Sequence, residues 1–201
     1  MIKSIVLLEF FTIVGGILLA LWVGYGFVIE GGVDAPQYTV LKKEGAIEIR
    51  DYPSLTLIKT TISESYPDNT SGGFRVLFRY ISGNNVRNQK IPMTAPVLHG
   101  KPYENDRTMM AFLLPSDMTK EKAPSPTDDA ALLDEWLVEQ VAVISFKGRC
   151  TTKKINKFVE RLETWLVDQN LSYRSSYLVA QYNSPYVFPL FRKNEIWIFL
   201  D

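Results

Sequence analysis

The longest uninterrupted apolar stretch of the chain lies near its N-terminus. The 20 residues from Phe10 to Ile29 include no charged side chain. A helix rises about 1.5 Å per residue, so a run of this length spans the roughly 30 Å hydrocarbon core of a bilayer. It is longer than the apolar region of about 7–15 residues in a cleaved signal peptide, which is the alternative. The pattern predicts a transmembrane anchor over residues 10–29, after a short segment 1–9 and before a linker 30–36.

The charges that flank this run predict its orientation. Lys3 precedes it and Glu30 and Asp34 follow it, while Trp22 and Tyr25 lie near its far end. Cytoplasmic flanks carry an excess of Lys and Arg, and amphipathic rings favour the membrane interface. We therefore expect a single-pass protein whose N-terminus is cytoplasmic and whose C-terminal part is extracytoplasmic. Because the chain also has too few cysteines for an internal disulfide, a bacterial envelope is the expected location.

The polar and apolar pattern after the linker begins with two strands. Ile47 to Arg50 alternates apolar and polar residues, and Leu55 to Thr61 is rich in β-branched residues. The residues from Asp51 to Ser54 between them have turn character. The pattern predicts a hairpin of these two strands.

A helix with one buried face should follow. Ser71 can cap its start, and Gly83 with Asn84 can end it. Its apolar residues recur at the spacing i, i+3, i+4, i+7, which is typical of an amphipathic helix. They are Phe74, Leu77, Phe78 and Ile81.

The second half of the chain repeats the plan of strand and then helix. Val141 to Phe146 predicts a strand, and the apolar positions from Ile155 to Leu166 predict a longer amphipathic helix. A proline-containing stretch from Pro115 to Asp129 predicts a surface loop between the halves. Further strand candidates are Met109 to Leu114, Tyr177 to Tyr182 and Glu195 to Leu200.

These elements predict an α+β domain over residues 37–201. With two helices and about eight short strands, mostly in consecutive hairpins, we expect a distorted antiparallel barrel or curved sheet of two pseudo-repeated halves. Two helices should pack on that sheet.

Composition narrows the chemistry that this domain can perform. Lys and Arg total 22, as do Asp and Glu, so the net charge is zero and nucleic acid is an unfavourable partner. A single cysteine and a single histidine, His99, exclude an internal disulfide and any site built from several imidazoles.

Three segments carry a family resemblance in the expected order along the chain. They are Phe74 to Asn85, the segment Ile91 to Val97 with its Met-Thr-Ala-Pro-Val sequence, and Tyr182 to Pro185 continuing to Arg192 to Trp197. Together they resemble the SOUL family of heme-binding proteins. That family is similar in fold to the effector-binding domains of bacterial drug-sensing regulators, which agrees with the duplicated pattern.

The resemblance implies binding of heme or a related tetrapyrrole in an apolar groove, for transport or sensing, without catalysis. It implies that Phe74 and Phe78 supply a face for the ring, that Arg79 reaches a propionate, and that Met93 and Tyr186 line the other side. A porphyrin needs such apolar faces together with one or two cations.

Simpler interpretations of the same residues stay open. An amphipathic helix buries its apolar stripe without any ligand, Arg79 is typical of a solvated surface charge, and Pro92 and Pro96 suit an irregular strand. No family ligand to iron falls on His99, which we expect to be an exposed residue at a strand end. The metal ligand is therefore unknown.

A small-molecule hydrolase or amphiphile sensor on the same fold is the alternative function. It would use Glu195, whose burial beside an apolar strand would raise its pKa toward that of a general base. The structural alternative is that Glu195 pairs with an arginine such as Arg192.

Overall fold

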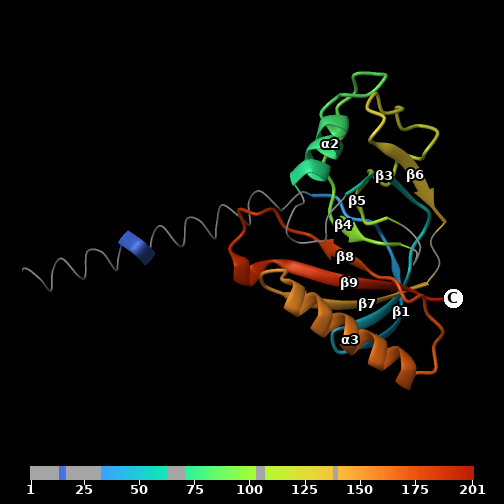
Figure 1. Cartoon of the computed structure of the whole chain (residues 1–201), viewed down its shortest axis with the longest axis vertical. Helices are drawn as coiled ribbons and strands as arrows, with labels where there is room; N and C mark the ends of the chain where they lie inside the picture. Colours follow the sequence, from blue (N-terminus) through green and yellow to red (C-terminus); the bar gives the residue numbers. More distant parts are fainter. Residues whose placement is uncertain (1–13, 17–32, 63–70, 103–106, 138–139) are drawn as a thin grey trace, which may run out of the picture.

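The computed structural model describes residues 14–16, 33–62, 71–102, 107–137 and 140–201. In these residues one antiparallel sheet curls into a half-barrel, with two long helices at opposite ends of it (Figure 1). The strands are β1 Thr39–Glu44, β2 Ile47–Asp51, β3 Leu55–Thr61, β4 Val97–Gly100, β5 Met109–Leu113, β6 Leu132–Trp136, β7 Gln140–Lys147, β8 Leu178–Gln181 and β9 Lys193–Phe199. The helices are α2 Ser71–Ile81, α3 Thr152–Asp168 and the short 3-10 helix η1 Pro189–Phe191.

The sheet is built from two equivalent halves. Its strand order is β1-β2-β7-β9-β8-β4-β5-β3-β6, and β8 and β4 meet at the centre. In one half β3, α2, β4 and β5 follow each other along the chain, and in the other β7, α3, β8 and β9 do so. In the first half β5 lies between β3 and β4, and in the second half β9 lies in the same way between β7 and β8. The predicted α+β class and pseudo-repeat are confirmed.

The predicted hairpin of β2 and β3 is wrong, because β2 and β3 belong to different halves of the sheet and do not pair with each other. β2 pairs with β7, and β3 pairs with β5 and β6. The reason lies in the side chains, since Ile47 and Ile49 pack in the core beneath α3 whereas Ile58 packs beneath α2. The turn around Pro53 thus carries the chain from one half to the other. Most strand pairs join segments that are distant in sequence, so the expectation of consecutive hairpins is wrong as well.

Both helices cover the convex face of the sheet, and the concave face has its own core. Strand residues alternate between the two, as in β5, where Met110 and Phe112 face α2 while Ala111 and Leu113 face inward. The concave core consists of Tyr52, Leu55, Leu57, Leu98, Met109, Ala111, Leu113, Val141, Val143, Leu178, Ala180, Trp197 and Phe199.

Helix α2 buries Leu77 and Ile81 of the predicted apolar stripe, but Phe74 and Phe78 of the same stripe are exposed. Its buried residues are Gly73, Leu77, Tyr80 and Ile81. Gly73 lies so close to the chain after β3 that a Cβ atom there would be 2.6 Å from Ile62 Cγ2. The absence of a side chain at Gly73 lets the helix settle with this residue against the sheet, which turns the phenylalanines of the predicted stripe outward.

The predicted surface loop Pro115 to Asp129 is partly buried. Ala123 is 6% exposed, and Tyr80 donates a hydrogen bond of 2.8 Å from its hydroxyl to the Pro124 carbonyl oxygen. The loop therefore covers one flank of α2.

The predicted transmembrane segment 10–29 lies outside the described residues, apart from 14–16. Among the helices of the described ranges, none combines the length and apolarity that a bilayer crossing needs. The anchor therefore stays a prediction. Asp34, in the linker before the first strand, contacts the domain, since the Ala95 amide donates a hydrogen bond of 2.8 Å to the Asp34 carbonyl oxygen.

Candidate functional site

Phe74 and Phe78 form a stacked aromatic pair on the surface of α2. They are 40% and 49% exposed, and their ring centroids lie 5.8 Å apart with an interplanar angle of 14°. Phe74 also meets Phe112 of β5 edge to face at 5.2 Å. Such residues are usually buried in a core, so two large rings held side by side in solvent provide a flat apolar surface for a ligand.

The position of the loop before β6 shows which way the aromatic pair faces. Tyr80 and Arg79 contact this loop, through Pro124 and Asp128 respectively. Successive helix residues are rotated by about 100°, so Phe74 and Phe78 project from the opposite flank of α2. The aromatic pair therefore faces away from this loop.

The other residues that the resemblance implies are more scattered. Met93 is half-buried and packs against the core beneath α2. The Arg79 guanidinium is 3.3 Å from the Asp128 carboxylate and remains half-exposed. Tyr186 lies in another element, the loop that joins β8 to η1, and is 68% exposed. The structure thus brings the two phenylalanines together and leaves the role of Tyr186 as a prediction.

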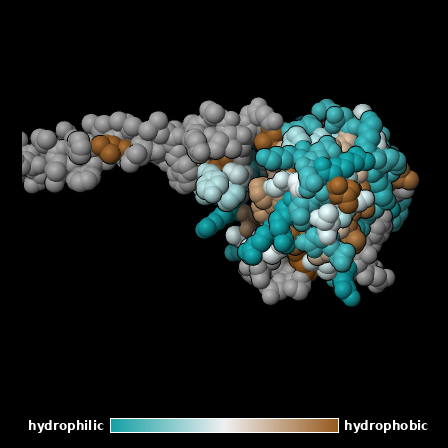
Figure 2. Space-filling view, turned by 90° about the horizontal axis from the view of Figure 1, so that it is seen from above, coloured by the Kyte–Doolittle hydropathy of each residue, from teal (hydrophilic) through white to brown (hydrophobic). Residues whose placement is uncertain are grey.

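The surface around this end of the molecule is mostly polar. Figure 2 shows it from above as largely hydrophilic, with hydrophobic residues scattered singly. Phe74 and Phe78 belong to the exposed large hydrophobic side chains of the described residues.

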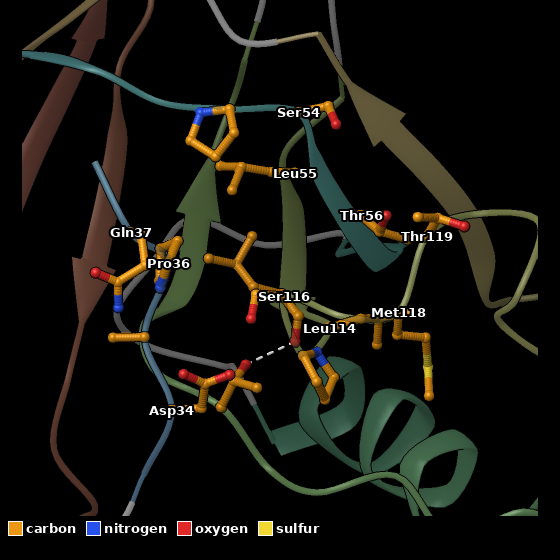
Figure 3. Close-up of a pocket in the computed structure, with 15 residues that line it drawn as sticks. Asp34, Pro36, Gln37, Ser54, Leu55, Thr56, Leu114, Ser116, Met118 and Thr119 are labelled. Carbon is orange, nitrogen blue, oxygen red and sulfur yellow. Dashed lines mark hydrogen bonds between the residues drawn. The ribbon is translucent and has the colours of Figure 1, made fainter. Parts of the chain in front are cut away.

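The Met-Thr-Ala-Pro-Val segment has a structural role. The Thr94 hydroxyl donates a hydrogen bond of 2.6 Å to the Leu113 carbonyl oxygen, and the Ala95–Pro96 peptide is cis. Thr94 also lines a cavity of about 190 Å³ between the segment Asp34–Gln37 and the chain after β5 (Figure 3). Its lining includes Leu55, Leu114 and Met118, and its size suits a few heavy atoms rather than a porphyrin.

His99 is buried, so the expectation of an exposed residue at a strand end is wrong. It lies on β4 between β5 and β8 and is 3% exposed. Burial lowers the pKa of its imidazole to about 4. The side chain borders a cavity of about 360 Å³ that is lined by His99, Gly100, Lys101, Thr108, Thr152, Ile155, Asn156, Ser175, Ser176, Tyr177 and Val179.

Glu195 is fully buried at the end of the concave face, where two of its partners come from β2 and β7. Arg50 donates two hydrogen bonds of 3.0 Å, one to each carboxylate oxygen. The Ser145 hydroxyl donates to Oε1 at 3.1 Å, and Lys193 Nζ lies 3.0 Å from the same atom. Oε2 accepts from the Tyr182 hydroxyl at 2.6 Å and from Trp197 Nε1 at 2.9 Å.

These contacts make Glu195 a structural carboxylate rather than a general base. Burial by itself raises its pKa, but the hydrogen bonds and charge of Arg50, with Lys193 and Tyr182, lower the pKa to about 2. A base must have a free lone pair and a pKa near the working pH. The expected rise in the pKa of Glu195 is thus wrong, and its arginine partner is Arg50 rather than Arg192. Arg192 instead donates to the Val187 and Pro185 carbonyl oxygens.

Arg50, Tyr52 and Trp197 also belong to this buried network, and the sequence motifs did not indicate them. A signal was present, because the β2 alternation places Glu48 and Arg50 on the face opposite Ile47 and Ile49. That face would normally be solvated in a two-layer sheet. Only the curling of the sheet makes it an interior.

The residues fit a porphyrin better than they fit a bare metal ion. In the described part of the chain, no group of three or more His, Cys, Asp or Glu side chains could hold a metal ion. The aromatic pair offers an apolar face, and Arg75 and Arg79 on the next strip of the helix surface offer cations for carboxylates.

The fold and this surface define a duplicated α+β half-barrel with an aromatic pair exposed on its first long helix. The sequence model described as SOUL heme-binding protein matches residues 33–199. The chain belongs to the SOUL heme-binding protein family. Human heme-binding protein 2 is 29% identical over 161 residues, which cover 77% of this chain and 78% of the human protein. Heme-binding protein 1 of Xenopus laevis is 26% identical over 163 residues, covering 78% and 85% respectively.

Solved structures confirm the fold. A hydrolase from Listeria innocua superposes with a TM-score of 0.56 at 11% identity, over 80% of this chain and 94% of the hydrolase. The C-terminal domain of EcmrR superposes with a TM-score of 0.53 at 11% identity, over 82% and 98%. At these identities the likeness concerns the fold alone.

Proposed function

We propose that this protein binds heme or a related tetrapyrrole on the aromatic pair of α2, as a carrier or sensor without catalysis. The observation that carries the proposal is the half-exposed stack of Phe74 and Phe78. Family membership and the names of the curated relatives support the choice of ligand.

The physical case rests on matching a flat amphipathic disc to a surface. When the macrocycle covers both rings, apolar surface is removed from water. Each Å² of apolar surface buried in this way contributes about 25 cal/mol of favourable free energy. Arg79 contacts Asp128 of the loop before β6 through a surface ion pair, and such pairs contribute about 0–1 kcal/mol. A propionate can therefore replace Asp128 at little cost.

We propose further that residues 10–29 anchor this domain to a membrane, with the N-terminus cytoplasmic. The uncharged length of the run and the preceding Lys3 support this placement. The binding domain would then lie outside the cytoplasm.

The test is a hemin titration of the full chain in a mild detergent, followed by Soret absorbance, with a detergent blank. We expect saturable one-to-one binding that weakens in Phe74→Ala and Phe78→Ala, and weakens further in the double variant. Arg79→Ala should reduce affinity for hemin more than for its dimethyl ester, which lacks the propionate charges.

Val167→Ala is the matched control, because Val167 is an exposed apolar residue on α3, at the other end of the sheet. It should bind hemin as the unmodified chain does. Equal affinity of the double phenylalanine variant and this control would show that the aromatic pair is not the binding surface.

A further inference from the structure

We propose that the loop between β8 and β9 inserts its apolar residues into the surface of an anionic lipid membrane. The inserted residues, 185–191, include η1 and form what we call the apolar tip. This contact goes beyond the proposed function, because it uses neither the aromatic pair of α2 nor residues 10–29.

The apolar tip exposes large hydrophobic side chains and carries no charge of its own. Tyr186 is 68% exposed, Leu190 is 69% exposed and Phe191 is 46% exposed. No residue from 185 to 191 is charged. Exposed apolar groups that are clustered in this way are typical of a surface that contacts a partner or a membrane, and a tyrosine ring favours the membrane interface. The heme surface proposed on α2 does not depend on Tyr186.

The loop is held from within, so the apolar tip has a defined shape. The Arg192 guanidinium donates hydrogen bonds to the carbonyl oxygens of Val187 at 2.9 Å and Pro185 at 2.7 Å. The rings of Phe188 and Phe191 contact each other, with centroids 5.9 Å apart. These contacts fix the loop while Leu190 stays on its outer surface.

The base of the apolar tip lies against the chain that joins β7 to α3. Lys147, the last residue of β7, pairs with Lys193, the first residue of β9. The Gly148 amide donates a hydrogen bond of 2.9 Å to the Arg192 carbonyl oxygen. Figure 1 shows η1, in red, and the first turn of α3 at the same end of the half-barrel. Two segments that are distant in sequence therefore meet beneath the tip.

These two segments contain cations and no anions. Every charged residue in the segments 147–157 and 182–193 is a Lys or an Arg, although the whole chain has equal numbers of cationic and anionic side chains. The exposed cations among them are Lys147, Arg149, Lys153 and Lys157. An uncharged apolar tip with cations around its base matches a membrane surface that presents anionic headgroups above its acyl chains. This charge complementarity favours anionic lipid as the partner.

The apolar tip also projects from the edge of the sheet at which the chain enters the domain. At this edge Gln181 of β8 pairs with Val97 of β4. Just before Val97, Thr94 forms a bridge with Asp34. A membrane anchor over residues 10–29 would hold this edge toward the bilayer, so the anchor and the tip would contact the same membrane.

The test places a fluorescent label on the apolar tip of the full chain. Leu190→Cys in a Cys150→Ser background gives one labelling site, because Cys150 is the only cysteine. Val167→Cys in the same background is the matched control, since Val167 is 61% exposed in the last turn of α3, far along the helix from the cations. Both chains are labelled with an environment-sensitive dye and incorporated into vesicles of phosphatidylcholine, with or without phosphatidylglycerol. The vesicles contain lipids with a doxyl quencher near the top of the acyl chain.

We expect the label at position 190 to shift to shorter emission wavelength and to be quenched in the vesicles that contain phosphatidylglycerol. The label at position 167 should show neither change. Lys147→Gln with Arg149→Gln should weaken the docking of the tip by about fivefold for each charge removed, as expected for cations near an anionic leaflet. Lys90→Gln with Lys120→Gln, at exposed lysines outside the two segments, should leave it unchanged.

The outcomes separate this inference from the other proposals. Equal quenching at positions 190 and 167, or equal quenching at position 190 with and without phosphatidylglycerol, would overturn it. Absence of quenching in every vesicle would also overturn it, and would favour an acidic protein as the partner of the tip. The experiment needs no heme, so its result does not depend on the proposed heme surface. Flotation of the unmodified chain with phosphatidylcholine vesicles tests the anchor separately.

Discussion

Arg50 of β2 and Glu195 of β9 form two parallel hydrogen bonds of 3.0 Å inside the curled sheet, although 145 positions separate them in the sequence. The contact exists because β2 lies in the half of the sheet that β7 and β9 build. Arg50 also donates hydrogen bonds to the Glu48 carboxylate and the Tyr52 hydroxyl, so this arginine links β2 to β9.

Removing the charge of Glu195 should strongly destabilise the fold. In Glu195→Gln the buried Arg50 loses its main counter-charge, and we expect the free energy of unfolding to fall by about 3 kcal/mol. Urea denaturation followed by circular dichroism measures this loss. Glu160→Gln on the exposed side of α3 is the control and should change stability by less than about 0.5 kcal/mol. Equal midpoints for the two variants would mean that the buried pair contributes nothing.

The same carboxylate predicts a pH dependence at low pH. Its folded pKa is about 2, below the ordinary value of 4.5, so unfolding takes up a proton between these values. The stabilisation is complete above about pH 4.5 and is lost as the pH falls toward 2. Stability curves of Glu195→Gln should be flatter in this window.

The lowered pKa of His99 predicts that stability also changes with pH in a second range, above that of Glu195. Its folded pKa of about 4 lies below the ordinary 6.5, so stability falls as the pH drops from 6.5 to 4. The slope should be reduced in His99→Gln. An unchanged slope in that variant would show that His99 does not differ in protonation between the folded and unfolded states.

The exposed phenylalanines should matter little for stability. Phe78→Ala should cost less than about 1 kcal/mol, whereas Leu77→Ala, at a fully buried neighbour, should cost about 2–5 kcal/mol. Thermal unfolding of the ligand-free variants compares them. A large loss in Phe78→Ala would place this side chain in the core and argue against a binding surface.

The two glycines at the start of α2 should respond in opposite directions. Gly73→Ala forces a Cβ to within 2.6 Å of the buried Ile62 side chain and should destabilise by about 1–3 kcal/mol. At Gly72 no atom lies within 4 Å of an added Cβ, so Gly72→Ala should stabilise the helix by up to about 1 kcal/mol. Differential scanning calorimetry of both variants tests this, and a common sign would contradict the close packing at Gly73.

The proposed membrane anchor predicts that the protein is found in the membrane fraction and that its C-terminus lies outside the cytoplasm. The full chain should sediment with membranes and resist extraction by high salt, because burial of residues 10–29 is hydrophobic rather than electrostatic. A reporter fused after Asp201 that is active only outside the cytoplasm should give signal. Activity of a cytoplasm-only reporter at the same position would overturn the orientation.

Local patterns in the sequence were sufficient for the elements but not for their partners. Alternation predicted β2, an apolar run predicted β7, and the 3.6-residue period predicted α2 and α3, because each pattern depends on neighbouring side chains along the chain. The pairing of β2 with β7 depends instead on which core Ile47 and Ile49 enter.

The candidate site divides in the same way. The chain's motifs were enough to indicate the family and, through it, Phe74 and Phe78 as a face for a ring, whereas His99 was expected to be exposed at a strand end. Which side chains are exposed and which are buried was decided by packing, since Gly73 turns α2 against Ile62 and the curl of the sheet buries His99 and Glu195. Side-chain periodicity is a property of neighbouring residues, whereas exposure and pKa depend on groups that only the folded chain brings together.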